Sequence, residues 1–221
     1  VRGTTTQPVV VMGASGEAMP VITRNIGDAV QNTINIEGSA SYLTISGLNI
    51  SSNGGDGINM NGNNAYITLE NNTIHDIDVG VNFKSDMNNI IVRRNHIYNT
   101  GQFGSTGEGM YVGCNNAVCR VTDSIIENNW IHDALPGTSQ GDGIELKVGS
   151  YNNIIRDNVI YNMPYPCIFA YGSAGGNGVN TIEGNVVWNC AEGISALSDA
   201  VVQNNIIIDS DLESYNHVQV S

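Results

Sequence analysis

The chain has 221 residues, of which 26 are glycine and 13% carry a charge, and its formal net charge is −13. This length is enough for one domain with a hydrophobic core of its own. The negative charge argues against nucleic acids and anionic membrane surfaces as partners, and no apolar run approaches the roughly 18 residues of a membrane-spanning helix.

Residues 1–32 are predicted to form an initial coil, because two strand-like segments, 9–13 and 20–24, flank a short glycine-containing turn. Regular coils are expected over residues 33–209, and residues 210–221 are expected to begin a further coil. Neither end shows an amphipathic helix that would cap a solenoid. We therefore expect one domain, 1–221, that either is a segment of a longer protein or associates end to end with another molecule.

A phrase built around one asparagine recurs through the regular coils. Its copies are LENNTIHD, VRRNHIYN, IENNWIHD, IRDNVIYN, IEGNVVWN and VQNNIIID, and the anchoring residues are Asn72, Asn95, Asn129, Asn158, Asn185 and Asn205. The gaps of 23, 34, 29, 27 and 20 residues hold short β-branched runs separated by Gly, Asn, Asp and Ser. Such a repeat predicts an all-β solenoid, a parallel β-helix of about seven or eight coils, with loops of variable length inserted at one corner.

Aligning the copies predicts which side chains stack from coil to coil. Two interior rows are expected, one of Ile50, Ile74, Ile97, Ile131, Ile160, Val187 and Ile207, and one of Ile45, Leu69, Val92, Ile126, Ile155, Ile182 and Val202. The anchoring asparagines should form a third row, whose amides hydrogen-bond between coils.

Asx residues that tolerate the left-handed conformation should line the next corner: Asp76, Asn99, Asp133, Asn162, Asn189 and Asp209. One exterior row should alternate in charge and have a structural role: Glu70, Arg93, Glu127, Arg156, Glu183 and Gln203.

Four cysteines bear on the cellular compartment. Cys114 and Cys119 flank a short loop and could close it, and Cys167 and Cys190 lie 23 residues apart, near one coil. Two disulfides would indicate a secreted, extracellular or cell-surface protein. Four free thiols are the alternative.

The strand that opens each coil breaks the regular pattern and is the expected place for chemistry. Its outward residues gather acids, lysines and tyrosines on one face: Asp56, Asn59, Asn61, Val79, Asn82, Lys84, Glu108, Tyr111, Gly113, Asp142, Glu145, Lys147, Phe169, Tyr171, Glu192 and Ser195. The longest corner loops, 100–107 and 134–140, lead into this face and would form the walls of a groove.

Two acids of this face, Glu108 and Asp142, lie one coil apart and could share a Ca²⁺ ion, because hard cations take several oxygen ligands at once. Asn82 and Glu145 would complete the site. The alternative is that these acids are solvated residues of turns. Lys147 could act as a general base, but a salt bridge is the favoured interpretation, because nearby acids raise the pKa of a lysine.

Aromatic residues recur just after the interior isoleucines: Ser51, His75, Tyr98, His132, Tyr161, Trp188 and Ile208. An exposed ladder of this kind could bind sugar rings, although ordinary stacking beneath the corner loops is the favoured interpretation. The substrate-binding candidates come from this row and from the acidic face: Asn82, Lys84, Tyr111, His132, Tyr161 and Phe169.

Residues 33–209 resemble right-handed parallel β-helix proteins of the pectin-lyase-like superfamily. A narrower resemblance, to polysaccharide lyases of the chondroitinase-B and alginate-lyase kind, rests on two phrases, DGIELK from Asp142 to Lys147 and NIIRDN from Asn153 to Asn158. In that family the acid helps to hold Ca²⁺, and the lysine removes the proton α to the uronate carboxylate. The resemblance therefore implies Asp142 as a calcium ligand and Lys147 as the base.

The chain departs from that family one coil later, where the family has Arg-His-Gly and this sequence has Tyr171 and Gly172. Tyr171 could serve as the acid instead, and Glu145 completes the set of catalytic candidates. We predict a secreted, carbohydrate-active protein, a Ca²⁺-assisted lyase that cleaves a uronate polysaccharide by β-elimination. A glycoside hydrolase that uses Glu108 and Asp142 is one alternative. A structural, fibre-forming or glycan-binding β-helix without catalysis is the rival class.

Overall fold

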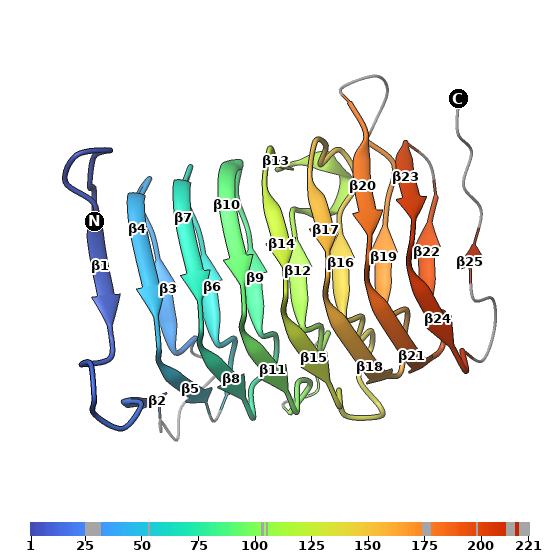
Figure 1. Ribbon diagram of the computed structural model, residues 1–221, viewed down its shortest axis with the longest axis horizontal. Helices are drawn as coiled ribbons and strands as arrows, with labels where there is room; N and C mark the ends of the chain where they lie inside the picture. The colour runs from blue at the N-terminus through green and yellow to red at the C-terminus, as the bar shows by residue number, and fades with distance from the viewer. Residues whose placement is uncertain are drawn as a thin grey trace.

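The computed structural model describes residues 1–24, 32–52, 54–102, 104, 106–173, 178–197, 199–210 and 215–216. Within these ranges the chain runs through successive short strands, with one 3₁₀-helix, η1 (Asn115–Ala117), and no α-helix. The described part therefore contains no helix that is long and apolar enough to span a membrane. The coils lie side by side along the long axis, with β1 at one end of the row and β23 near the other (Figure 1).

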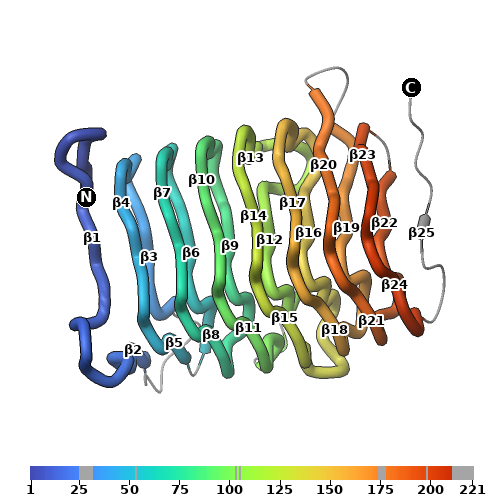
Figure 2. The backbone as a smooth tube through the Cα atoms, in the orientation of Figure 1, coloured from blue at the N-terminus to red at the C-terminus, as the bar shows by residue number. Residues whose placement is uncertain are grey.

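The strands pair in parallel and form three sheets that run along the molecule (Figure 2). Sheet A contains β1 (Val9–Met12), β4 (Ser41–Ser46), β7 (Ala65–Glu70), β10 (Met87–Arg93), β14 (Ile125–Glu127), β17 (Ile154–Arg156), β20 (Asn180–Glu183) and β23 (Ala200–Gln203), with β13 (Val121–Thr122) also beside β10. Sheet B contains β2 (Val21–Arg24), β5 (Asn49–Ser52), β8 (Thr73–His75), β11 (His96–Tyr98), β15 (Trp130–His132), β18 (Val159–Met163), β21 (Val186–Cys190) and β24 (Ile206–Ile208). Sheet C contains β3 (Ile34–Ile36), β6 (Ile58–Met60), β9 (Val81–Phe83), β12 (Met110–Val112), β16 (Ile144–Leu146), β19 (Ile168–Ala170), β22 (Ile194–Ala196) and β25 (Tyr215–Asn216).

This topology confirms the predicted right-handed parallel β-helix. Each regular coil gives one strand to each sheet, and neighbours within a sheet come from successive coils. In the described residues, sheet A follows eight coils from β1 to β23, which agrees with the predicted number. The initial strands β1 and β2 pair with β4 and β5, and β25 pairs with β22. Residues 211–214 and 217–221 of the predicted further coil lie outside the described part.

The two predicted interior rows are confirmed residue by residue. Ile97 pairs with Ile74 on one side and with Ile131 on the other, and Val92 pairs with Leu69 and Ile126 in the same way. These six side chains are at most 3% exposed. Burial of each such aliphatic side chain contributes about 1.5–3 kcal/mol, so the stacked rows form the hydrophobic core.

The predicted row of asparagine amides is also confirmed. The Asn129 Nδ2 atom donates to the Val92 carbonyl at 2.9 Å and to Asn158 Oδ1 at 3.0 Å, and Asn158 Oδ1 also accepts from the Asn129 backbone N–H. A second interior row, which the sequence did not predict, links Ser124, Asn153 and Asn180 in the same manner. Both rows satisfy buried polar groups at bends between sheets.

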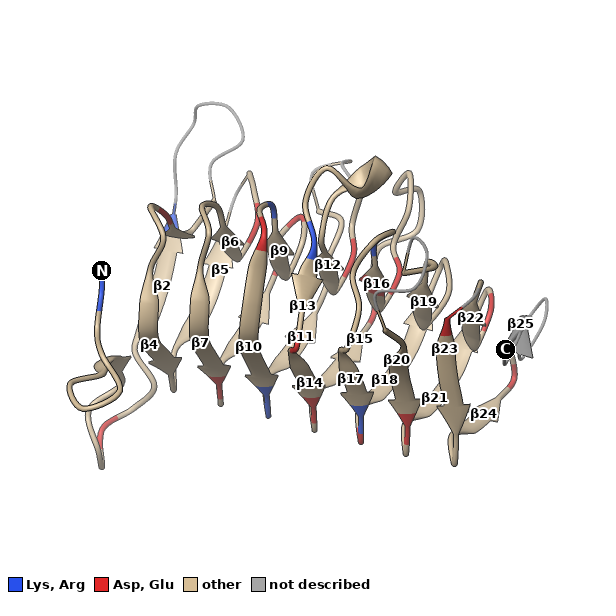
Figure 3. Cartoon of the chain, turned by 90° about the horizontal axis from the view of Figure 1, so that it is seen from above, with Lys and Arg blue, Asp and Glu red and all other residues tan. Residues whose placement is uncertain are grey.

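The predicted corner and exterior rows take their expected conformations. All six Asx residues of the corner row have φ between 45° and 58°, which Asn and Asp adopt more readily than other non-glycine residues. In the exterior row Arg93 donates to Glu70 at 2.7 Å, and Arg156 donates to Glu127 at 2.6 and 2.8 Å. Figure 3 shows the charge alternating between the ends of β7, β10, β14, β17 and β20.

Both predicted disulfides are present. Cys114 is bonded to Cys119 and Cys167 to Cys190, so the alternative of four free thiols is wrong. The first bond closes a six-residue loop that begins just after β12, and the second joins β21 to the turn before β19. The first bond therefore holds a loop against sheet C, where the acidic face lies.

Candidate active site

Glycine stacking brings the acids of the acidic face close together. Glu108 and Asp142 are each followed by a glycine, and the coils approach so tightly there that a Cβ on Gly109 would collide with the Gly143 carbonyl oxygen. The Gly109 N–H donates to the Asp142 carbonyl oxygen at 2.9 Å. The recurring acid–glycine pair thus places two carboxylates one coil apart, at the start of neighbouring strands.

Three carboxylates converge at this corner. One oxygen each from Glu108, Asp142 and Glu145 lies within 4.8 Å of the others, and the three residues are at most 1% exposed. Four of their oxygens have no hydrogen-bond partner: both of Glu108, Oδ1 of Asp142 and Oε2 of Glu145. These acids are therefore buried rather than solvated, which corrects the alternative interpretation of them as solvated turn residues.

Burial changes the acidity of all three groups. It raises the pKa of Glu108 to about 7 and that of Asp142 to about 8, and it also raises the pKa of Glu145. The neighbouring carboxylates raise the pKa of Asp142 further, because like charges disfavour ionisation. The cluster therefore holds protons near neutral pH unless a cation compensates the charge.

Lys147 lies beside this carboxylate cluster. Its Nζ atom donates to Glu145 Oε1, and its side chain is 3% exposed, so the predicted ion pair is confirmed. The same Nζ atom lies 4.4 Å from the centroid of the Tyr111 ring and 5.2 Å from that of Tyr171. The Lys147 side chain is thus held between one carboxylate and two aromatic rings.

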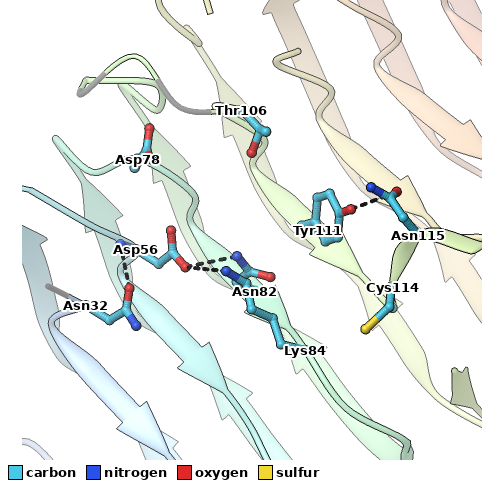
Figure 4. Close-up of a pocket in the computed structure, with 10 residues that line it drawn as sticks. Asn32, Asp56, Asp78, Asn82, Lys84, Thr106, Tyr111, Cys114 and Asn115 are labelled. Atoms are coloured by element: carbon cyan, nitrogen blue, oxygen red, sulfur yellow. Dashed lines mark hydrogen bonds and ion pairs between the residues drawn. The ribbon is translucent and has the colours of Figure 1, made fainter. Parts of the chain in front are cut away.

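Two hollows lie on the acidic face, and Lys147 lines the smaller one. The larger has a volume of about 610 Å³, and its lining includes Asp56, Asn82, Lys84, Tyr111 and Asn115 (Figure 4). The smaller has a volume of about 260 Å³ and is lined by Asn115, Asn116, Lys147, Val148 and Tyr171. Asn115 belongs to the disulfide-closed loop, lines both hollows and accepts a hydrogen bond from Tyr111 Oη at 3.0 Å. The loop therefore stands between two neighbouring parts of one groove.

The predicted corner loops lie next to each other at the edge of this groove. The Gln140 N–H donates to the Thr106 carbonyl oxygen at 3.2 Å, and the Thr100 hydroxyl donates to the Gly107 carbonyl oxygen at 2.6 Å. Thr106 lines the larger hollow, as a wall residue would. Residues 103 and 105 of the first loop lie outside the described part.

Asn82 lies apart from the carboxylate cluster. Its Nδ2 atom donates to Asp56 at 2.9 Å, and Lys84 Nζ lies 3.9 Å from the same carboxylate oxygen (Figure 4). In the strand register Tyr111 stands between Asn82 and Glu145, so these two residues are two coils apart, roughly 10 Å. The structure therefore groups Glu108 and Asp142 with Glu145, but not with Asn82.

The other substrate-binding candidates are divided between two sheets. Phe169 follows Glu145 in the strand register and its ring centroid lies 4.3 Å from that of Tyr171, on the acidic face. His132 and Tyr161 lie on sheet B, where their rings are parallel and 4.8 Å apart, and Tyr161 also stacks on Trp188. Neighbouring rings cover the faces that a sugar would need, and both residues lie on a different sheet from the acidic face. Their role in binding a substrate stays a prediction.

Some residues of the groove, Asp78 and Asn115 among them, were not singled out from the sequence. Asp78 lines the larger hollow, is 2% exposed, and its Oδ1 atom has no hydrogen-bond partner. The loop of Asn115 is fixed by the predicted Cys114–Cys119 bond. The cysteine spacing was the available signal for Asn115, whereas Asp78 lies in a turn without a recurring pattern.

The carboxylate cluster fits a hard cation such as Ca²⁺. Glu108, Asp142 and Glu145 offer oxygen ligands only, and their four unpartnered oxygens need either protons or a cation. Calcium prefers six to eight oxygen ligands, which carboxylates and water or substrate oxygens can supply together.

Comparison with known proteins yields one family and several structures. The family model described as "Right handed beta helix region" matches residues 9–179 and 122–212. A search of the curated proteins finds no matching sequence.

Three solved structures are similar in fold. An alginate lyase from Paenibacillus sp. str. FPU-7 has a TM-score of 0.64 and 21% identity, over 99% of this chain and 86% of that one. Pectate lyase Pel9A has a TM-score of 0.60 and 13% identity, over 100% of this chain and 66% of that one. A periplasmic alginate epimerase has a TM-score of 0.58 and 12% identity, over 97% of this chain but only 45% of the epimerase chain. At these identities the likeness establishes the fold alone.

Proposed function

Because the chain belongs to the right-handed β-helix family, we propose that its acidic face is the active site of a Ca²⁺-assisted polysaccharide lyase, which cleaves a uronate-containing glycan by β-elimination. The observation that carries this proposal is the buried Lys147, held between Glu145 and two tyrosines beside three buried carboxylates. The likeness in fold to an alginate lyase and a pectate lyase supports the same chemistry.

In this proposal Glu145 pairs with Lys147, and the calcium ion is held by Glu108 and Asp142. Their unpartnered buried oxygens support the assignment, since burial without a proton or a cation would be costly. When bound, the ion would neutralise the carboxylate of the uronate and so make the neighbouring C–H more acidic.

Lys147 is the proposed base. Before it can accept a proton from carbon, its ammonium must lose one, and Glu145 is the hydrogen-bonded acceptor beside it. Burial raises the pKa of Glu145, which makes that carboxylate a better proton acceptor. The neutral Lys147 amine then removes the proton α to the uronate carboxylate, and the electron pair of that C–H bond forms the new C=C bond.

Tyr171 is the proposed acid. As the C=C bond forms, the glycosidic C–O bond breaks, and the departing oxygen needs a proton. Burial raises the pKa of Tyr171, so the phenol keeps its proton until a stronger base such as that oxygen develops beside it. Tyr111 donates to Asn115 instead, which supports a role in binding the neighbouring sugar.

The rest of the groove would bind the polysaccharide chain. Lys84, whose side chain is 53% exposed, could pair with a second uronate carboxylate, and Asn82 and Phe169 would contact neighbouring sugars. Export from the cell is part of the proposal, because two disulfides are typical of oxidising compartments.

A matched pair of lysine variants tests the proposal. Lys147→Ala should lower the rate of unsaturated product formation by roughly 10³-fold or more at saturating substrate, because the base is lost. Lys84→Ala should mainly raise KM, because a binding contact is lost. Circular dichroism should show that both variants keep the β-helix. Comparable activity in folded Lys147→Ala and wild type would refute the assignment of the base.

The rival proposal is a structural or glycan-binding β-helix without catalysis. It is supported by apolar side chains exposed on strands β1 and β24, such as Met12 at 60% and Ile206 at 55%. In that case native mass spectrometry at rising concentration should show end-to-end association, and no unsaturated product should form. A strict monomer would count against it.

A further inference from the structure

A column of residues on sheet A, a different sheet from the one that carries the acidic face, takes an unusual backbone conformation. The strand pairings place one residue from each of five successive coils in this column, and all five have φ between 49° and 58°: Tyr42, Tyr66, Asn89, Asp123 and Asn152. Asn and Asp occupy left-handed positions readily, whereas a bulky residue there is a conformational outlier. Two tyrosines therefore stand where the backbone favours Asx.

The two outlying tyrosines form one platform. Their ring centroids are 4.6 Å apart and the ring planes differ by 2°. Tyr66 is 47% exposed, although most aromatic side chains are largely buried. The next coil carries Asn89, so the stack of rings ends at Tyr66 and no further ring of the column covers its outer face.

A groove of about 320 Å³ runs beside this platform. Besides the two tyrosines, its lining includes hydroxyl, amide and carboxylate groups of Thr44, Thr68, Asn89 and Asp123. No lysine or arginine is among the described residues that line it. A flat apolar face surrounded by hydrogen-bonding groups matches a pyranose ring, which has apolar C–H faces and a rim of hydroxyls.

We propose that Tyr42 and Tyr66 bind a neutral glycan, with a pyranose ring stacked on Tyr66 and its hydroxyls hydrogen-bonded to Asn89 and Asp123. A neutral sugar is favoured over a polyanion because the lining offers a carboxylate and no cation, and the whole chain carries a net charge of −13. This site lies on sheet A and the acidic face on sheet C, so the proposal does not depend on the proposed lyase activity.

The backbone conformation supports a binding role for these rings. Asn at position 66 would relieve the strain of the left-handed conformation, as it does at position 89 in the next coil. Tyr66 takes a backbone conformation that tyrosine disfavours, and its ring stays exposed beside a groove. This combination is expected of a functional position.

Isothermal titration calorimetry of the full chain with cellohexaose, xylohexaose and mannohexaose tests this site, with oligoguluronate as the anionic comparison. At least one neutral hexasaccharide should bind the wild type, and Tyr66→Ala and Tyr66→Asn should each weaken that binding roughly tenfold or more. Tyr165→Ala removes a ring that is 40% exposed elsewhere and should leave binding unchanged.

Thermal unfolding of the same variants separates binding from backbone strain. Tyr66→Asn should melt at a higher temperature than Tyr66→Ala, because asparagine adopts the left-handed conformation more readily than alanine. Both variants should nevertheless show the same decrease in glycan affinity, since both lack the ring. The proposal is overturned if no neutral hexasaccharide binds, if either Tyr66 variant binds as well as the wild type, or if only oligoguluronate binds.

Discussion

The buried acids should make the metal-free protein less stable as the pH rises. Glu108 is fully buried, and burial raises its pKa from the ordinary 4.5 to about 7. A carboxyl group with a raised pKa binds its proton more tightly in the folded chain than in the unfolded one. Its contribution to stability is therefore complete below pH 4.5 and is lost as the pH rises through 7. The difference between the two pKa values corresponds to about 3 kcal/mol.

Glu108→Gln isolates this contribution, because glutamine is a neutral isostere of the protonated acid and can donate to Asp142 or Glu145. We would measure urea unfolding by circular dichroism from pH 4.5 to 8 in the presence of a chelator. Relative to the variant, the wild type should lose about 3 kcal/mol across this range, or roughly 6–12 °C in melting temperature. Glu17→Gln, at an exposed position, should follow the wild type.

Calcium should reverse the effect. Because cation binding requires ionised carboxylates, added Ca²⁺ should raise the melting temperature of the wild type more at pH 8 than at pH 5, and more than that of Glu108→Gln. Parallel pH curves for the wild type and Glu108→Gln in chelator would refute the reasoning, because Glu108 would then titrate as an ordinary surface acid.

Three other substitutions test the forces that hold the coils together. Asn158→Ala should lower the free energy of unfolding in urea by about 3 kcal/mol, because it leaves buried donors and acceptors of the adjacent coils without partners. Asn205→Ala, at the end of the row, should lower it by less. Equal losses for the two variants would contradict the interior amide row. Replacing both Cys167 and Cys190 by alanine should cost about 3 kcal/mol, as expected for a separation of 23 residues, and an unchanged urea midpoint would contradict this. Arg156→Ala should lower the free energy of unfolding by less than about 1 kcal/mol, since the side chain is 39% exposed. A loss above about 2 kcal/mol would contradict the minor contribution to stability that we assign to the exterior row.

The fold could be predicted from the sequence because each coil repeats the same few requirements. Ile97 and Ile131 must face inward, Asn129 must satisfy its amide within the stack, and Asp133 must turn a corner at positive φ. A one-residue error in register would expose every interior side chain, so the pattern allows only one alignment. The second amide row could also have been found, since Asn153 precedes its anchoring asparagine by the same five residues as Ser124 precedes Asn129.

The candidate site was harder to predict because burial depends on loops. Alternation along β16 correctly placed Glu145 on the outer side of sheet C, but it gave no sign that this side is covered and that Lys147 is only 2% exposed. The covering comes from corner loops and a disulfide loop, whose paths are not set by the repeat. The tyrosine platform was missed for a different reason, since Tyr66 interrupts a strand with a left-handed residue that side-chain alternation does not reveal.

The most direct test of the central claim is the ultraviolet absorbance of unsaturated uronate, followed as the wild-type chain acts on alginate, pectate and chondroitin sulfate, with Ca²⁺ or with a chelator. The proposed lyase predicts a steady rise with at least one of these polymers in Ca²⁺, a much smaller rise in chelator, and none for Lys147→Ala. A flat trace with every polymer in Ca²⁺ would contradict β-elimination at the acidic face.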